Sequence, residues 1–462
     1  MARARVMLGD LLDGLPPHRT AVHLGDETIE ACALRARASA VAELLDGVAP
    51  GAPIAVRLPN SIELIATLFG VWKAGAVYLP VNPRLTAIEV ERVLGEVRPA
   101  AVIGDGEWPT TLADPARHDA DIALIQFTSG TTGPPKPVPL RHSGVLALLE
   151  GVIATLRTRP PSDAEPMPNL VPVSLSLWAG IYQVLFAYRI GAPVVIMDRF
   201  EPTTFAALVR RHSIRSTVLP PAAMTMLADE PAVESLAPLE YVRSITAPLS
   251  PLQARRFRDR FGVAVLNGYG QTEIGGEIIG WSAMDTKTFG DSKLGATGRP
   301  HAGVHVRTDA HGELQVRTPA TSAGYASAEL TDRVTEDGWF RTGDLARIDD
   351  DGFVWIDGRV SDMINRGGLK VFPEEVAEVL RLSPAVADAA VAGAPDERLG
   401  EVPWAFVVPA AGPDEIDVNE LDALCRAHLA PYKVPARIEI VDALPRNEIG
   451  KVTIAALIPP TH

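Results

Sequence analysis

Short apolar runs alternate with longer amphipathic segments through most of the chain. Runs at 53–58, 194–197 and 216–219 have the length of buried strands, and segments at 61–73 and 203–212 have the length and spacing of helices. This alternation is typical of parallel sheets whose faces are covered by helices. We therefore predict an α/β fold with a large N-terminal body of helix-covered, mostly parallel sheets.

The pattern changes near residue 360. A turn signal at 351–352 followed by an alternating run predicts a hairpin, and hence a smaller β subdomain. Pro373 followed by two glutamates is a strong helix start, because proline fits the first helical position and acidic side chains suit the first turn. Strands at 386–392, 403–408 and 437–441 and a helix at 419–429 follow. We predict a body over 1–360 and a small α+β domain over 361–462.

Composition narrows the class of protein. The 462 residues are enough for two or three domains, and 47% hydrophobic with 22% charged residues are the proportions of a globular chain. The 43 basic and 57 acidic residues leave a net charge of −14, which repels polyanions, so we expect no nucleic-acid partner. A phosphorylated ligand must then be bound by individual lysines and arginines.

The cysteines and the most apolar region indicate the compartment. Cys32 and Cys425 are too few for a disulfide framework and lack metal-ligand spacing, as expected in a reducing compartment. The most apolar region, 171–197, is interrupted by Gln183 and Arg189, so we expect no membrane span. Both observations predict a cytoplasmic protein.

A segment rich in glycine and hydroxyl side chains, from Thr128 to Lys136, follows an apolar run that predicts a buried strand at 122–127. Glycines let backbone N–H groups converge on an anion, the hydroxyls add donors, and Lys136 adds a positive charge. An ordinary flexible loop has similar composition, so the segment alone does not decide the matter. The nucleotide loop of kinases and GTPases does not fit, because Pro134 and Pro135 separate the last glycine from the lysine.

Three later stretches carry chemistry that a phosphate site needs. The first reads Asn-Gly-Tyr-Gly-Gln-Thr-Glu over 267–273, and we expect it where a strand runs into a loop. The second covers 338–345 and continues to Arg359, and the third is a polar loop over 445–452 that contains Lys451. Taken singly, Glu273 is more typical of a carboxylate beside a helix start, and Lys451 of a solvated turn.

In this order the four stretches resemble the acyl-activating, or adenylate-forming, superfamily, which includes acyl-CoA synthetases, adenylation domains of peptide synthetases and luciferases. The resemblance spans nearly the whole chain. It implies an AMP-forming acyl-CoA synthetase that activates an apolar carboxylic acid with ATP and transfers the acyl group to coenzyme A. It also implies that the body carries the ATP and acyl sites, while the C-terminal domain is a mobile lid with the catalytic lysine. This reaction needs no protein nucleophile, and the chain has no order of residues that suggests one.

The resemblance implies a nucleotide site made of residues from all parts of the body. Its members are Thr128, Ser129, Gly130, Thr131, Thr132, Gly133, Lys136, Asn267, Gly268, Tyr269, Gly270, Asp344, Ile356 and Arg359. In the family Tyr269 would stack on adenine, Asp344 would hold the ribose hydroxyls, and Arg359 would contact ribose or phosphate.

The resemblance also implies the catalytic groups. Thr272 would bind the α-phosphate and Glu273 would ligate Mg²⁺, which prefers oxygen ligands. Lys451 would be the catalytic lysine. The hinge of the lid would be Ser361, where the family generally has Asp or Lys. Coenzyme A would meet Gly367, Gly368 and Lys370 on the lid.

The acid site is assigned to Trp178, Thr246, Gly268 and Gly275. Trp178 could equally be a plain core tryptophan. The family usually has two glycines where this chain has Ile245 and Thr246, so we expect a narrower pocket. The wall near Trp178 lacks polar groups, which favours an apolar acid.

Several readings stay open at this stage. The acceptor thiol could belong to an acyl carrier protein acting in trans instead of coenzyme A. A nucleotide-binding regulator that has lost catalysis is a further alternative, and luciferase-like oxidation is a remote one. A homodimer is left open.

Overall fold

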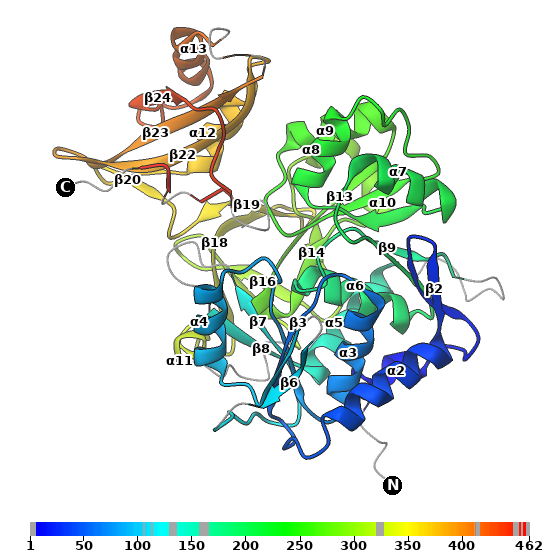
Figure 1. Ribbon diagram of the computed structural model, residues 1–462. Coiled ribbons are helices and arrows are strands. Elements are labelled where there is room, and N and C mark those ends of the chain that lie inside the picture. Colours follow the sequence, from blue (N-terminus) through cyan, green and yellow to red (C-terminus); the bar gives the residue numbers. More distant parts are fainter. Residues whose placement is uncertain are drawn as a thin grey trace.

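The predicted strands assemble into five sheets in the computed structural model (Figure 1). The structure describes residues 6–104, 107–111, 114–128, 136–156, 166–319, 328–410, 412, 416–446, 452–453 and 456–458. Four of the sheets belong to the body, and the fifth lies in the C-terminal part. No helix within those ranges is long and apolar enough to cross a membrane.

A six-stranded sheet runs through the N-terminal part of the body in the order β6-β5-β3-β4-β7-β8. Its strands are β3 (Pro53–Arg57), β4 (Val77–Pro80), β5 (Ala101–Gly104), β6 (Glu107–Thr111), β7 (Ile122–Thr128) and β8 (Lys136–Arg141). The four inner strands are parallel, whereas both edge strands pair antiparallel. The strand predicted at 122–127 is therefore confirmed as β7, and it lies inside the sheet.

Helices α2 (Ala31–Leu44) and α3 (Ile62–Lys73) pack closely together beside this sheet (Figure 1). Ser61 caps α3 by accepting a 3.1 Å hydrogen bond from the backbone N–H of Leu64. A Cβ on Gly70 would lie 2.6 Å from Cβ of Val41, so only glycine permits this approach. The helix predicted at 61–73 is thus confirmed.

Two further sheets complete the α/β body. One has the order β2-β1-β10-β9 and the other β11-β12-β13-β14-β15. Their strands are β1 (Thr20–Leu24), β2 (Glu27–Glu30), β9 (Asn169–Val171), β10 (Val194–Ile196), β11 (Ser216–Val218), β12 (Tyr241–Ser244), β13 (Ala264–Gln271), β14 (Gly276–Gly280) and β15 (Arg299–Pro300). The pairs β1–β10, β10–β9, β11–β12 and β12–β13 are parallel, as the alternation of strands and helices predicts.

Further helices cover the sheets of the body and connect their strands (Figure 1). They are α1 (Asp10–Asp13), α4 (Ala87–Val97), α5 (His142–Leu156), α6 (Trp178–Arg189), α7 (Pro202–Arg211), α8 (Pro221–Asp229), α9 (Pro251–Phe261) and α10 (Ala283–Phe289), with the short turns η1 (Thr272–Ile274) and η2 (Gly290–Lys293) and the helix α11 (Ala328–Thr331). The helix predicted at 203–212 appears as α7.

The smaller β subdomain is an antiparallel sheet in the order β16-β17-β18-β19. Its strands are β16 (His305–Thr308), β17 (Glu313–Arg317), β18 (Phe340–Ile348) and β19 (Val354–Arg359). The turn predicted at 351–352 joins β18 to β19, where Gly352 has φ 79°. This hairpin places Asp344 directly opposite Arg359.

The C-terminal part forms a separate α+β unit, yellow to red at one end of the molecule in Figure 1. It contains β20 (Ile364–Arg366), β21 (Leu369–Val371), α12 (Pro373–Leu380), β22 (Val386–Asp396), β23 (Gly400–Pro409), α13 (Val418–His428) and β24 (Arg437–Ile440). A hydrophobic cluster drawn entirely from residues 364–434 forms its core. Because the C-terminal unit has a hydrophobic core of its own, a domain boundary near residues 360–361 is reasonable. The boundary itself stays a prediction.

Candidate active site

The stretch at 267–273 lies at the end of strand β13 and on the turn η1, so the predicted strand end is confirmed, although the strand continues as far as Gln271. β13 pairs parallel with β12 up to Asn267 and then antiparallel with β14 from Gly268 onward. A Cβ on Gly270 would overlap the carbonyl of Gly276, which has φ 125°. These glycines let the chain fold back as a hairpin, and the strand geometry therefore continues through the motif.

Asp344 brings the predicted nucleotide residues together. Its Oδ2 accepts hydrogen bonds of 2.6 Å from the hydroxyl of Tyr269 and from Nε2 of Gln271. Its Oδ1 lies 3.0 Å from Nε of Arg359 on the neighbouring strand. Asp344 is only 4% exposed, so an uncompensated carboxylate there would be costly. Strands of two different sheets thus converge on one buried acidic group.

Burial and nearby charges shift the pKa values of Tyr269 and Arg359. Burial, and then the charge of Asp344, raise the pKa of Tyr269 well above its usual value, so the phenol stays a donor. Burial acts to lower the pKa of Arg359, but the charge of Asp344 and those of Asp362 and Glu273 outweigh it and raise that pKa. The guanidinium therefore remains the counter-charge of the carboxylate.

Two residues of this network were missed by sequence reasoning. Gln271 lies inside the motif, two positions after Tyr269, and that spacing could have marked it as a neighbour on the same strand face. Arg333 had no sequence signal. Its Nη2 donates to the carbonyl of Thr342 at 2.7 Å, its Nη1 lies 3.7 Å from Oε1 of Glu273, and its guanidinium stacks 4.3 Å from the ring of Phe340.

Two other predicted nucleotide residues pack beside this network. Ile356 on β19 is partly buried against the same hydrophobic cluster as Tyr269. Asn267 donates from Nδ2 to the carbonyl of Ala296 at 3.2 Å, and its Oδ1 accepts from the N–H of Gly268 at 3.1 Å. Asn267 therefore fixes the backbone where β13 changes its partner.

The residues assigned to the acid lie beside the same hairpin. Trp178, at the start of α6, is 7% exposed and donates from Nε1 to the carbonyl of Gly275 at 3.0 Å. A Cβ on Gly268 would lie 3.2 Å from Cγ2 of Ile245 and 3.0 Å from the carboxyl carbon of Glu277. Trp178, Gly275 and Gly268 are therefore brought together, with a carboxylate that the sequence analysis did not single out.

Thr246 has an unusual backbone conformation. Its φ is 81°, a region that β-branched residues rarely occupy. Such a conformation costs about 1–3 kcal/mol and persists only where the surroundings impose it. The strained turn follows directly after β12, at the edge of the predicted acid site.

Comparison with known proteins identifies the family. Residues 14–119 and 104–326 match the family model described as AMP-binding enzyme, and residues 375–451 match the AMP-binding enzyme C-terminal domain. The chain belongs to the AMP-binding enzyme family.

Several curated relatives of this AMP-binding enzyme are named as CoA ligases or CoA synthases. A feruloyl-CoA synthase from an Amycolatopsis species is 32% identical, covering 95% of each chain. The indoleacetate–CoA ligase of Aromatoleum aromaticum is 29% identical, covering 95% of this chain and 94% of its own. The long-chain-fatty-acid–CoA ligase FadD13 of Mycobacterium tuberculosis is 29% identical over 88% of this chain and 87% of its own.

Solved structures share the whole fold. ATP-bound MatB from Rhodopseudomonas palustris superposes with a TM-score of 0.86 at 26% identity, covering 97% of both chains. The amide bond synthetase McbA from Marinactinospora thermotolerans gives 0.85 at 27% identity, covering 97% of this chain and 98% of its own. The predicted fold class and the predicted superfamily are thereby confirmed.

The segment predicted to bind phosphate lies between β7 and β8. Thr128 ends β7, Lys136 begins β8, and the two residues pair directly across the strands. Ser129, Gly130, Thr131, Thr132 and Gly133 lie outside the described residues, and so does the catalytic candidate Lys451. Lys451 belongs to the polar loop over 445–452. Two described residues of that loop, Arg446 and Val452, form an antiparallel bridge on the C-terminal unit.

Thr272 and Glu273 of this AMP-binding enzyme lie on η1, directly after β13. The side chain of Glu273 is 17% exposed, so it can reach a ligand while it stays close to the Asp344 network. A partly exposed carboxylate offers the oxygen that Mg²⁺ prefers, and phosphate oxygens and waters usually complete its octahedron. Glu273 therefore fits the predicted role of a metal ligand.

The hinge and acceptor candidates lie on turns. Ser361, between β19 and β20, donates from its hydroxyl to Asp362 at 2.8 Å. Gly367 and Gly368 connect β20 to β21 with φ of 60° and 90°, a turn that glycine favours, and Lys370 is exposed on β21.

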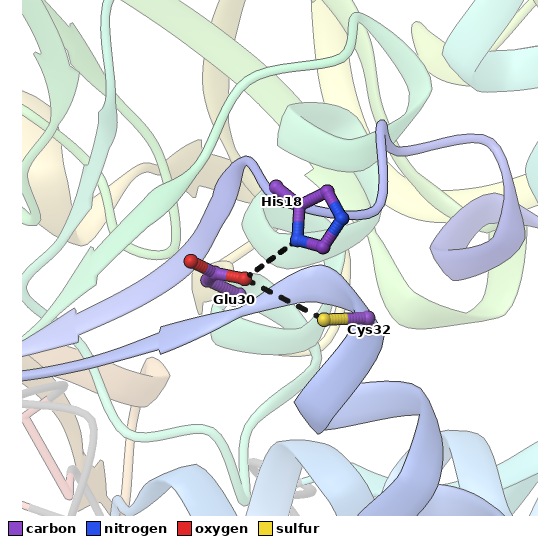
Figure 2. Close-up of side chains that lie close together, drawn as sticks. All are labelled: His18, Glu30 and Cys32. Carbon is purple, nitrogen blue, oxygen red and sulfur yellow. Dashed lines mark hydrogen bonds and ion pairs between the residues drawn. The ribbon is translucent and has the colours of Figure 1, made fainter.

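An exposed cluster of His18, Glu30 and Cys32 lies on the edge sheet of this AMP-binding enzyme (Figure 2). The carboxylate of Glu30 is 3.1 Å from Nδ1 of His18 and accepts from the thiol of Cys32 at 3.5 Å. These hydrogen bonds account for the arrangement. His18 precedes β1, Glu30 ends β2 and Cys32 lies on α2, whereas Tyr269, Asp344 and Arg359 of the predicted nucleotide site lie on β13, β18 and β19.

Proposed function

We propose that this AMP-binding enzyme is an ATP-dependent ligase that converts a carboxylic acid to an acyl-adenylate and then to its coenzyme A thioester. The observation that carries the proposal is the buried Tyr269–Asp344–Arg359 network, in which two strands of the β subdomain and strand β13 hold one carboxylate beside an aromatic ring. A preorganised acceptor beside an aromatic ring suits a nucleoside. Relatives that match almost the entire chain and are named as a CoA synthase and a CoA ligase support this choice.

The nucleotide is proposed to lie along the β13–β18–β19 edge. Tyr269 would offer its ring to adenine, and its hydrogen bond to Asp344 holds the ring in place. Asp344 would accept from the ribose hydroxyls, since an ionised carboxylate is a pure acceptor. Arg359 balances its charge and faces the same edge.

In the first step a carboxylate oxygen of the acid attacks the α-phosphorus of ATP. The new bond joins that oxygen to phosphorus, and the bond to the bridging oxygen breaks, so pyrophosphate leaves with the electron pair. Two anions approach each other, and the main catalytic need is positive charge at the shared oxygens. We propose Lys451 and Lys136 for this role, together with Thr272 at the α-phosphate. Mg²⁺, when held by Glu273, supplies further charge neutralisation.

In the second step a thiol attacks the acyl carbon, a thioester forms and AMP leaves. We propose that the C-terminal unit turns about Ser361 between the steps, so that Lys451 withdraws and the turn at 367–368 meets the incoming pantetheine. Lys370 is exposed on that unit and could pair with an anionic part of the acceptor. Arg366 is less suited, because it donates to the carbonyl of Tyr432 at 2.8 Å.

The decisive experiment is acid-dependent release of pyrophosphate, followed by coenzyme A-dependent release of AMP. We expect both products in equal amounts, with the acyl-CoA ester as the third product. Pyrophosphate release that does not depend on acid, or none at all with a broad panel of acids, would refute the ligase assignment. The panel should contain aliphatic and aryl acids, because relatives are named for ferulate, indoleacetate and long-chain fatty acids.

A carrier protein is the second candidate acceptor. ScoC of Streptomyces coeruleorubidus, named a fatty acid–[acyl-carrier-protein] ligase, is 32% identical and covers 88% of this chain and 86% of its own. Thioester formation should be measured in parallel with coenzyme A and with a phosphopantetheinylated carrier protein. If the carrier protein is acylated faster than coenzyme A, the proposed acceptor is the carrier protein and not coenzyme A.

A further inference from the structure

Three polar side chains form a buried cluster beneath Gly268. They are Arg243 on β12, Glu277 on β14 and His301 just after β15, with side chains 11%, 6% and 3% exposed. Oε1 of Glu277 pairs with Nη1 of Arg243 and lies 3.1 Å from Nε2 of His301. A Cβ on Gly280 would lie 2.6 Å from Nη1 of Arg243, so this glycine makes room for the cluster.

The cluster lies against a residue assigned to the acid site. The carboxyl group of Glu277 lies directly under Gly268, where a Cβ would approach it to 3.0 Å. Tyr182 lies on α6 together with Trp178, and its ring packs edge-on against the ring of Trp178, with ring centroids 5.6 Å apart. Burial, and then the charge of Glu277, raise the pKa of Tyr182, so its neutral hydroxyl lies within electrostatic reach of the cluster.

Two buried polar atoms of this group have no hydrogen-bond partner among the described residues. They are the hydroxyl oxygen of Tyr182 and Nδ1 of His301, the ring nitrogen that does not face Glu277. Buried polar atoms without partners are rare in folded proteins and call for an explanation. The neighbouring Tyr188, on the same helix α6, shows the ordinary case, because its hydroxyl donates to the carbonyl of Ala21 at 3.4 Å.

We propose that Tyr182, Glu277 and His301 form the far wall of the acid pocket and select acids whose distal end carries a neutral hydrogen-bonding group, such as a hydroxyl. A hydroxyl can accept from Tyr182 and donate to Nδ1 of His301, which would satisfy both unpartnered atoms. The inference rests on the proposed function. The acid is still expected to have an apolar body, which Trp178 and Ile245 would contact. In addition, it is expected to carry a neutral hydrogen-bonding group at its far end.

The charges of the cluster explain why the distal group should be neutral. Glu277 repels a distal carboxylate, and Arg243, which could attract one, is already paired with Glu277. A distal ammonium would likewise gain little from Glu277, which is already paired with Arg243, and it would meet the like charge of Arg243 in the same buried space. A neutral donor and acceptor avoids both penalties.

The test compares matched acids by acid-dependent pyrophosphate release. Two pairs suffice: octanoic with 8-hydroxyoctanoic acid, and 3-phenylpropanoic with 3-(4-hydroxyphenyl)propanoic acid. We expect wild type to favour a hydroxylated acid in kcat/KM. Tyr182→Phe should reduce that preference by about fivefold to tenfold, the usual effect of one neutral hydrogen bond. Tyr188→Phe, the same change on the same helix, should leave the preference unaltered.

A second variant tests the charge argument. Glu277→Gln keeps the shape of the side chain and leaves Arg243 without its carboxylate, so we expect kcat/KM for suberic acid to rise relative to octanoic acid. Equal use of hydroxylated and plain acids by wild type, or equal effects of Tyr182→Phe and Tyr188→Phe, would overturn the inference while the ligase function stands. No acid-dependent pyrophosphate with any acid would overturn the proposed function and this inference with it.

Discussion

The hydroxyl of Tyr269 donates a 2.6 Å hydrogen bond to Asp344, although 75 positions separate the two residues in the chain. The bond joins the hairpin β13–β14 to the antiparallel subdomain that carries β18. Because Asp344 also pairs with Arg359, the groups proposed for adenine, ribose and phosphate are positioned as one unit. A substitution of any one of these residues should therefore weaken the binding of the whole nucleotide.

Asp344→Asn tests this unit directly. The variant loses the negative charge that faces Arg359 and the acceptor strength of a carboxylate, which is worth about 1.5–3 kcal/mol for a hydrogen bond to a charged group. We expect the KM for ATP to rise by roughly 10-fold to 100-fold. Asp350→Asn changes an exposed turn residue in the same subdomain and should leave that KM unchanged. An unaltered KM in Asp344→Asn would refute the proposed contact with ribose.

Lys451→Ala separates the two half-reactions. The lysine is proposed to stabilise charge only while pyrophosphate leaves, so adenylate formation should fall by at least about 100-fold. Thioester formation from supplied acyl-adenylate should stay near the wild-type rate. Lys287→Ala, an exposed lysine on α10, serves as the control for loss of charge. Equal losses in both half-reactions would show that Lys451 does not have this role.

Ser361→Pro tests the hinge between the body and the C-terminal unit. Proline fixes its own φ and restricts the residue before it, so a rotation at this position should be hindered. We expect the thioester-forming step to slow more than adenylate formation, as measured by single-turnover kinetics of each step. Ser361→Ala removes only the hydrogen bond to Asp362 and should leave both rates intact. A second step at the wild-type rate in the proline variant would argue against a hinge here.

Thr246→Gly tests the strained turn after β12. Glycine adopts φ near 81° freely, so the variant relieves about 1–3 kcal/mol of strain and loses about 1 kcal/mol to the greater freedom of the unfolded chain. We expect the free energy of unfolding to stay level or rise by up to about 2 kcal/mol, measured by denaturant titration. Thr246→Ala keeps a Cβ at the same φ and should gain nothing. A clear loss of stability in the glycine variant would mean that contacts of the threonine side chain outweigh the strain.

Much of the architecture could be predicted because its signals are local. The apolar run at 122–127 became β7, the segment at 61–73 became α3, and Pro373 begins α12. Periodicity and capping depend on residues within a few positions of one another, so a single sequence contains them. The order of the motifs likewise identified the superfamily, and it singled out Tyr269, Asp344 and Arg359, whose side chains meet in the structure.

The relationships between distant segments could not be read in this way. Pairing of β13 with β14 continued the strand through the motif, because Gly270 tolerates the backbone of Gly276 at close range. Arg333 reached Glu273 only through the folding of the β subdomain.

By itself the sequence determined where helices and strands begin, which family the chain resembles and which residue types could hold a nucleotide. Tertiary structure alone decided which side chains meet: Glu277 lies 34 positions from Arg243 and 24 from His301, yet all three share one buried site. A buried charge needs a partner of opposite charge close to it in space. When several sheets lie between two residues in the chain, their sequence separation does not show whether they are such partners.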